Sequence, residues 1–524
     1  MKRVNPWLVA AAVVIPTFME VLDTTIANVA LRYMAGGLSA AQSDAEWVIT
    51  SYLAANAIIL PVSGWLSQRL GRRRYFLISI ALFTLASALC GVASSLEALI
   101  LFRILQGLAG GGLQPSTQGI LLDTFPQEKQ GQAMAVFGVA ALVAPILGPT
   151  LGGWITDHWS WRWIFYINIP VGLLGWLASY YLVEDPAYIA EQRAALVKRG
   201  APFDSVGLSL LVLVMSAWEV FLSKGQEWDW LGDPEHRVHV LLGMFVVGLG
   251  TLIWWELRHP DPVINFKPLA ERNFRIACLL AFATFGALYG ATTLIPSMLQ
   301  SLMGYSALQS GLVLSPAGFF SVSMMPVVAV LLGRGTDARR LIFSGLVVMS
   351  MGFFRMATLS LAAGPSDFMW ARVVQIVGLS LIFAPLSVAA YIYLPQNLRG
   401  AATGIFSLLR NEGGSVGTSV ARTIAERREA LHTLRLGESL TPFDPAVAAY
   451  TEPLAATYQQ ATGDPVASQQ MAWQSLDNLR HNQAAAMGYL DAFFALGVTA
   501  LVLTLSVAMM KRSVAEKGAH LIAE

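Results

Sequence analysis

The sequence predicts an all-α integral membrane protein of fourteen spans, built as two six-helix halves with two helices inserted between them. Three observations predict this fold class: the composition, the number of long apolar stretches and an internal repeat. Of the 524 residues, 55% are hydrophobic and only 13% are charged, whereas about a quarter of the residues in soluble chains are charged. A spanning helix needs roughly 20 mostly apolar residues. We expect spans near residues 7–30, 46–66, 75–95, 97–121, 132–153, 163–183, 205–223, 238–256, 275–298, 308–332, 341–361, 367–393, 401–423 and 486–510.

The internal repeat relates the two six-span halves by a constant shift. From Arg103 to Arg372 and from Pro126 to Pro395 the shift is 269 positions in both cases. Because this register persists over three spans, we interpret it as a duplication. Parallel repeats of this kind are typical of the major facilitator superfamily, in which the substrate site lies near the midplane between the halves. The same shift relates Gln106 to Gln375, Gln127 to Gln396, Gly131 to Gly400, Phe137 to Phe406, Gly148 to Gly417 and Gly64 to Gly333.

Domain boundaries follow from the repeat. We expect an N-terminal half at 1–183, a linker with the two inserted spans at 184–274, and a C-terminal half at 275–524. A long polar insertion at about 425–483 separates the last two spans. Its mixture of alanine, glutamine and charged residues favours partly helical structure, and a flexible loop is the alternative.

The distribution of lysine and arginine predicts which side each loop faces, because cytoplasmic loops carry an excess of both. With the N-terminus inside, the arginine clusters at 69–74 and 334–340 fall on the cytoplasmic side. We therefore expect a multi-pass membrane protein with both termini cytoplasmic and the insertion on the outside. The short outside loops hold only Arg32, Arg162, Lys224 and Arg237.

Composition and motifs also exclude several classes of protein. The net charge of +1 gives no basic signal for nucleic acid. The two cysteines, Cys90 and Cys278, both fall in apolar spans and predict neither a disulfide framework nor a metal site. HExxH and Walker motifs are absent from the sequence, so we expect neither an enzyme nor transport driven directly by ATP, and no cofactor.

The stretch from Gly138 to Gly153 reads GVAALVAPILGPTLGG inside an apolar span. Proline in a helix interior removes a backbone hydrogen bond and bends the helix, and glycine lets a neighbouring helix come close. A bent, closely packed helix would explain the pattern in any polytopic protein. The pattern also resembles the antiporter motif of the major facilitator superfamily. The residues that carry this resemblance are Gly138, Pro145, Gly148, Pro149, Gly152 and Gly153.

A second resemblance lies in the loop between spans 2 and 3. Gly64-Trp-Leu-Ser-Gln-Arg69-Leu-Gly71-Arg72-Arg-Arg is similar to the superfamily loop G-x-L-a-D-r-x-G-r-r. In that family the small residues permit close helix packing and the arginines can hold neighbouring helices. This sequence departs from the pattern because Gln68 replaces the usual acid, which places a charge latch through that position in doubt. A simple positive-inside anchor is the alternative.

Spans 1 and 4 carry the charged residues of the resemblance. Leu22 to Ala30 resembles the LDxTIVNVA pattern of the fourteen-span drug:proton antiporters of the EmrB/QacA type, and Arg103 resembles the arginine linked to proton coupling. Asp23 is the implied proton carrier, with a structural acid bonded to Thr24, Thr25 or Asn28 as the alternative. Glu20 lies on about the same helix face, so the partner of Arg103 is either Asp23 or Glu20.

Trp161 to Pro170 reads WRWIFYINIP, which resembles a segment typical of the same branch and looks like an interfacial tryptophan belt. Polar residues inside spans are functional candidates by default. The role of Glu412 cannot be transferred, because the branch usually has an uncharged residue there. Glu219 is expected to face protein or the outer interface. We place in the substrate cavity, as candidates, Asn28, Gln106, Gln114, Arg410 and Glu412.

The resemblance implies a proton-coupled multidrug efflux antiporter that exports hydrophobic or amphipathic compounds by alternating access. It also implies a location in the bacterial inner (plasma) membrane, with the insertion 425–483 in the periplasm. There the insertion would dock a periplasmic adaptor protein, as part of a tripartite assembly with an outer-membrane channel. The alternative is an exporter of one narrow substrate class, such as fatty acids or a siderophore. The proton carrier remains open among Glu20, Asp23 and an acid of the second half.

Overall fold

The computed structural model describes residues 5–514 except 187, 192, 195–203, 439 and 442, and every regular element in this part of the chain is a helix. The first nine α-helices are α1 (Pro6–Gly37), α2 (Gln42–Ala45), α3 (Trp47–Leu70), α4 (Arg72–Gly91), α5 (Leu96–Gly110), α6 (Leu113–Thr124), α7 (Gln130–His158), α8 (Trp163–Tyr166) and α9 (Asn168–Leu182). The remaining helices are α11 (Ser205–Lys224), α12 (Arg237–Glu256), α13 (Arg272–Ser301), α14 (Ala307–Gly333), α15 (Ala338–Ala357), α16 (Pro365–Tyr391), α17 (Arg399–Glu438), α18 (Pro445–Thr462) and α19 (Pro465–Ala508).

The all-α membrane fold is confirmed. Among the described residues, 13 helices are long and apolar enough to cross a membrane, with α5 and α6 counted as one span and α8 and α9 as another. The remaining expected span, 401–423, is the first part of α17. Its Arg410, Glu412, glycines and serines lower its mean hydropathy, although the helix runs through the bundle beside α13 and α19.

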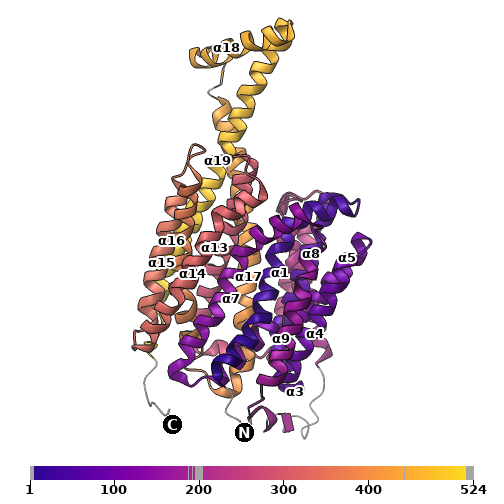
Figure 1. Ribbon diagram of the computed structural model, residues 1–524, viewed down its shortest axis with the longest axis vertical. Coiled ribbons are helices and arrows are strands. Elements are labelled where there is room, and N and C mark those ends of the chain that lie inside the picture. The colour runs from indigo at the N-terminus through magenta and orange to yellow at the C-terminus, as the bar shows by residue number, and fades with distance from the viewer. Residues whose placement is uncertain are drawn as a thin grey trace.

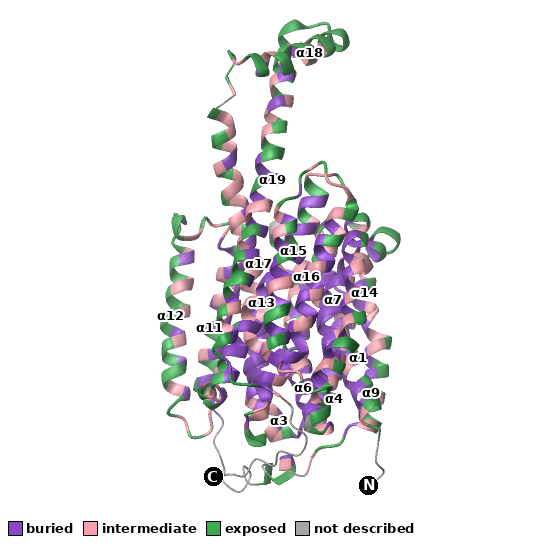
Figure 2. Ribbon diagram, turned by 90° about the vertical axis from the view of Figure 1, so that its left-hand side faces the viewer, coloured by how far each residue is buried: buried purple, intermediate pink, exposed green. Residues whose placement is uncertain are grey.

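Two groups of helices pack side by side (Figure 1). We call α1–α9 the N-terminal bundle and α13–α19 the C-terminal bundle. They meet where α7 packs on α14 and α16, and where α17 packs on α3 and α6. We call the end at which α1 begins and α19 ends the terminus side, and the opposite end the hairpin side. Buried residues fill the interior of both bundles (Figure 2).

At the terminus side the two bundles are in close contact. A Cβ atom at Gly64 of α3 would lie 2.5 Å from the carbonyl oxygen of Gly400 at the start of α17. The Tyr391 hydroxyl donates to the Gln118 side-chain oxygen at 3.0 Å, again across the interface. Such a close backbone approach requires glycine at position 64, so this contact and the Tyr391–Gln118 hydrogen bond join the bundles at this end.

The two inserted helices differ in their surroundings. Helix α12 packs on α11 and leaves Val240, Val246 and Val247 exposed by 59–70%, which fits a lipid-facing surface (Figure 2). Helix α11 contacts α3 of the N-terminal bundle and α17 of the C-terminal bundle. Of the two inserted helices, α11 therefore lies at the junction between the bundles.

The polar insertion is more regular than expected. Helix α17 continues to Glu438, α18 follows, and α19 begins at Pro465, so the described part of 425–483 is almost entirely helical. The alternative of a flexible loop is wrong for this part. The helices project from the bundle as a hairpin crossed by α18 (Figure 1). At its base, His432 and Arg428 of α17 both contact Asp491 of α19, the histidine at 2.8 Å.

Candidate functional site

Asp23 lies at the centre of a buried polar cluster in the N-terminal bundle. Its Oδ2 accepts from Arg103 Nη1 at 2.5 Å, and its Oδ1 accepts from Gln106 Nε2 at 3.0 Å and Asn168 Nδ2 at 2.7 Å. Arg103 also donates to the Val48 carbonyl oxygen, and its guanidinium stacks on the Tyr52 ring at 4.0 Å. A buried arginine needs such compensation because it cannot lose its proton.

This cluster shows which acid pairs with Arg103, a choice that the sequence left open. The partner of Arg103 is Asp23 and not Glu20. The alternative in which Asp23 bonds Thr24, Thr25 or Asn28 is wrong. Thr24 and Thr25 donate to their own helix backbone, as does Asn28.

Glu20 occupies a second buried site one turn away on α1. Its Oε1 accepts from Asn56 Nδ2 at 3.1 Å and from the Tyr52 hydroxyl at 3.3 Å, while its Oε2 accepts from Gln114 Nε2 at 2.8 Å. Among the described residues, all of its direct hydrogen-bond donors are neutral, and its side chain is almost fully buried. Glu20 thus differs from Asp23, whose charge is balanced by a guanidinium group in contact.

Gln114 connects Glu20 to the other bundle. Its amide nitrogen donates to Glu20, and its Oε1 accepts from Arg410 Nη2 of α17. The chain Glu20–Gln114–Arg410 therefore crosses the interface between the bundles. We call it the polar bridge.

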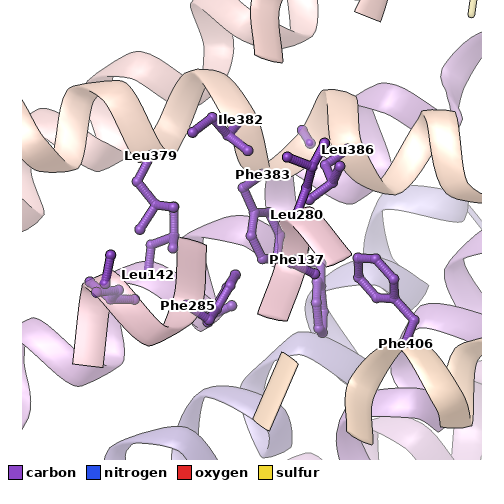
Figure 3. Packing of buried hydrophobic residues seen from close by; sticks show 14 of the residues in the cluster. Phe137, Leu142, Leu280, Phe285, Leu379, Ile382, Phe383, Leu386 and Phe406 are labelled. Atoms are coloured by element: carbon purple, nitrogen blue, oxygen red, sulfur yellow. The ribbon is translucent and has the colours of Figure 1, made fainter. Parts of the chain in front are cut away.

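Aromatic rings surround the polar bridge. The Arg410 guanidinium lies 5.5 Å from the ring centroid of Phe137 and 5.4 Å from that of Phe285. Phe383 stacks on Phe137 and lies beside Phe285, each at 5.8 Å between centroids (Figure 3). Figure 3 also shows Phe406 next to this group. A charged bridge between aromatic walls can hold an amphipathic molecule whose charged group replaces one end of the bridge.

Not all of the residues that the sequence predicts to line the substrate cavity lie at the polar bridge. Gln106 belongs to the Asp23 cluster inside the N-terminal bundle, where it is fully buried. Asn28 is exposed and bonds its own helix. Glu412 faces α11 and not Gln114. Gln114 and Arg410 are the two candidates that the structure brings together.

Helix α7 carries the glycine- and proline-containing stretch as one continuous helix, Gln130–His158, with Pro145 and Pro149 inside it. A Cβ at Gly148 would lie 2.1 Å from Thr25 Oγ1, and one at Gly152 would lie 3.0 Å from Ile26 of α1. A Cβ at Gly138 would lie 2.7 Å from Phe383 of the other bundle. Gly153 is buried as well. The stretch therefore packs α7 against the helix that carries Glu20 and Asp23.

The loop between α3 and α4 makes charge contacts despite Gln68. Arg72 pairs with Asp123 at the end of α6, and Arg69 pairs with Asp261 at 2.5 Å. Gly71 has φ +88°, a conformation that favours glycine. Asp123 also lies 3.7 Å from Arg399 of the C-terminal bundle. The acid that links the loop to the second bundle is therefore Asp123, which no motif in the sequence indicated.

Two further residues were missed. Asn168 belongs to the tryptophan-rich segment that the sequence predicts to be structural, yet it donates to Asp23. Thr292 accompanies Arg372 in the second half, where Arg372 Nη2 contacts Thr292 Oγ1 at 2.6 Å. The repeat shift could have indicated Thr292, because it is the position equivalent to Asp23.

Two helical bundles with buried charges and a polar bridge between them are the arrangement of a secondary transporter. Residues 13–418 match the family described as the Major Facilitator Superfamily. Multidrug export protein EmrB of Haemophilus influenzae is 39% identical over 439 residues, 84% of this chain and 84% of its own. Fatty acid resistance protein FarB of Neisseria gonorrhoeae is 36% identical over 428 residues, 81% of this chain and 82% of its own.

Among solved structures, the human organic anion transporter MFSD10 is similar with a TM-score of 0.61, covering 96% of this chain and 99% of that one. At 14% identity this likeness concerns the fold alone. The chain belongs to the Major Facilitator Superfamily, and within it to the EmrB type, as the motifs had predicted. It is a multi-pass membrane transporter of small molecules.

Proposed function

We propose that this protein exports hydrophobic or amphipathic drugs in exchange for protons, by alternating access of the N-terminal and C-terminal bundles. The observation that carries the proposal is the polar bridge, which joins a buried acid of one bundle to a buried arginine of the other among aromatic rings. The similarity to the multidrug export protein EmrB supports the choice of substrate class.

Glu20 is the group that exchanges a proton for a cationic substrate in this proposal. A buried carboxyl that receives only neutral hydrogen bonds can alternate between a protonated form and a form paired with a bound cation. Asp23 is already paired with Arg103. The Asp23–Arg103 pair then holds α1 against α5, with Asn168 and Gln106 completing the geometry.

Proton release from the purified protein tests this assignment. We expect ethidium binding to release protons from the wild type and from Glu97→Gln, a matched control in which an exposed carboxyl on α5 is removed. Glu20→Gln should abolish the release, because it has no proton to exchange. Release that persists in Glu20→Gln but disappears in Asp23→Asn would assign the proton to Asp23. Absence of release in the wild type would contradict proton–cation exchange.

Export of one narrow substrate class is the second candidate. Arg410 could pair with a carboxylate between the rings of Phe137 and Phe285, and a relative at 36% identity is a fatty acid resistance protein. A transport panel of cationic dyes, neutral detergents and fatty acids separates the two. Export of fatty acids alone would favour the narrow exporter, and export across the panel would favour the multidrug exporter.

The helical hairpin is the proposed docking site for a periplasmic adaptor protein, which would connect the transporter to an outer-membrane channel. In this orientation the protein lies in the bacterial inner membrane with both termini in the cytoplasm. The termini themselves lie outside the described residues. The hairpin exposes apolar side chains far from the membrane-spanning bundle, among them Phe443 at 93% and Leu434 at 69% exposure. Exposed apolar residues of this kind mark interaction sites.

A deletion of 440–478 tests the docking proposal without opening the bundle. Gly437 and Arg480 lie next to each other, since a Cβ at Gly437 would be 2.7 Å from the Arg480 guanidinium. A short glycine-serine linker can therefore close the gap. We expect loss of adaptor pulldown and of efflux, with ethidium binding by the purified transporter unchanged. Retained pulldown and efflux would exclude docking through the hairpin.

A further inference from the structure

Helix α11 is attached to both bundles near the hairpin side. On the N-terminal bundle, Ser223 bonds Thr50 at 2.6 Å, and Lys224 Nζ lies 3.0 Å from Glu46 Oε2. On the C-terminal bundle, Ser419 Oγ of α17 donates to the Leu222 carbonyl oxygen at 2.8 Å. The helix therefore connects the two bundles at the end opposite the close glycine contact of Gly64 and Gly400.

One of these attachments is a pair of buried acids. Glu219 of α11 and Glu412 of α17 are 2% and 6% exposed, and their carboxyl groups face each other within hydrogen-bonding range. Glu219 Oε1 accepts from Ser415 Oγ at 3.1 Å. From the described residues, neither oxygen of Glu412 receives a hydrogen bond of normal geometry. The groups that face Glu412 are the Glu219 carboxyl and the Trp218 indole.

Positive charges near the acid pair have other partners. Arg410 contacts Gln114, Arg422 contacts Glu426, and Lys224 contacts Glu46 and Glu227. Helix α3 has no charged side chain between Val48 and Gln68. On α13, the ionisable group that packs on α17 near Glu412 is Tyr289, whose ring lies against Gly414. Two ionised carboxylates in contact in such surroundings repel each other strongly.

We propose that Glu219 and Glu412 share one proton and form a proton-dependent latch between the inserted helix α11 and the C-terminal bundle. With the proton present, the carboxyl group of one residue donates to the carboxylate of the other. When the proton leaves, the two carboxylates repel each other and the contact between α11 and α17 opens at the hairpin side. The pair is a proton site separate from Glu20 and Asp23, and it gives the inserted helices a role in the transport cycle.

The shared proton does not depend on the proposed export function, whereas the latch role rests on it. Infrared spectroscopy of the full chain in lipid nanodiscs tests the proton without any substrate. In a Glu20→Gln, Glu256→Gln background, which removes two other buried acids, we expect a protonated-carboxyl band near neutral pH. The double variant E219Q/E412Q should remove this band, and E426Q, which changes a partly exposed acid of α17, should retain it. A band that persists in E219Q/E412Q, or is missing before either residue is changed, would overturn the shared proton.

A spin-label pair tests the latch. Asp229 and Arg427 lie on the α11 and α17 sides of the junction, with Oδ1 and Nη2 3.9 Å apart. With Cys90 and Cys278 replaced by alanine, labels on Asp229→Cys and Arg427→Cys should show strong dipolar broadening that is lost as the pH rises. E412Q and E219Q should keep the broadening at every pH, because a glutamine can bond the remaining carboxyl without repulsion. E412D, which keeps a carboxyl group at this position, should show the same pH-dependent loss of broadening as the wild type. Identical loss of broadening in the wild type, E219Q and E412Q would overturn the latch.

Discussion

Asp23 and Thr292 occupy equivalent positions of the sequence repeat, and each contacts the equivalent arginine of its own bundle. Asp23 lies 2.5 Å from Arg103, and Thr292 lies 2.6 Å from Arg372. Both arginines also bond the glutamine three residues later. The first half therefore has a buried ion pair where the second half has a neutral hydroxyl. Of the two equivalent arginine clusters, the one in the N-terminal bundle therefore contains an acid, and the one in the C-terminal bundle has a threonine in its place.

The first prediction uses the second half as a template for the first. Asp23→Thr should fold and reach the membrane, because Arg372 and Thr292 already form such an arrangement. Loss of the ion pair should cost up to about 3–5 kcal/mol of stability, reduced by the new hydroxyl contact. Proton-driven drug resistance should fall in cells that express the variant at wild-type level. Full resistance would show that the ion pair is not needed for coupling.

The second prediction concerns the polar bridge. Arg410→Gln removes its positive end while Gln114 can still bond Glu20. Binding of anionic amphiphiles should weaken at least about tenfold, equivalent to about 1.4 kcal/mol, whereas cationic dyes should keep or gain affinity. Ligand titration of purified protein measures both. Arg422→Gln, an exposed site on the same helix paired with Glu426, is the control. Equal effects on cations and anions would contradict a charge-selective bridge.

The third prediction concerns the glycine contact at the terminus side. Gly64→Ala places a methyl group 2.5 Å from the Gly400 carbonyl oxygen, so the bundles must separate there. A cysteine at Gln118, whose side chain bonds Tyr391 across the same interface, should then react faster with a water-soluble maleimide. Gly250→Ala is the matched control, because its added Cβ would meet no atom within 4 Å. Unchanged reactivity in Gly64→Ala would show that this contact does not close the terminus side.

The fourth prediction concerns Asp337, the position equivalent to Gln68 in the repeat. Burial raises the pKa of Asp337, but hydrogen bonds from the Arg339 side chain and from the backbone N–H groups of Arg339 and Ser513 outweigh it. The pKa therefore lies below its ordinary value of 3.8. A lowered pKa stabilises the folded state above the ordinary value, and this contribution is lost as the pH falls below it.

Asp337→Asn should therefore lower the free energy of unfolding at pH 7 by less than about 1 kcal/mol, since its arginine partner is partly exposed. The difference between variant and wild type should vanish when the pH is lowered past the folded-state pKa of Asp337. Thermal unfolding in detergent at both pH values measures it. A difference that stays constant with pH would show that the charge of Asp337 has no part in holding Ser513.

The sequence by itself determined the membrane class, the repeat and the family. These features depend on local properties: the length of apolar stretches, the spacing of arginines and glycines, and a register of 269 positions. It also identified Glu20, Asp23, Arg103, Gln114 and Arg410 as polar residues within spans, because such residues are rare in an apolar background. Neither the pairing of these residues nor the helical hairpin followed from that signal.

Tertiary structure alone decided the partners. Whether Arg103 pairs with Asp23 or with Glu20 depends on how α1 and α5 are rotated about their axes, and both acids lie on about the same face of α1. Gln106 and Gln114 are two turns apart, yet one joins the Asp23 cluster and the other reaches Arg410 across the interface. The contact of Glu219 with Glu412 joins helices from two parts of the chain that the repeat does not relate. Contacts between distant segments arise from packing of whole helices, for which a single sequence without its fold has no local pattern.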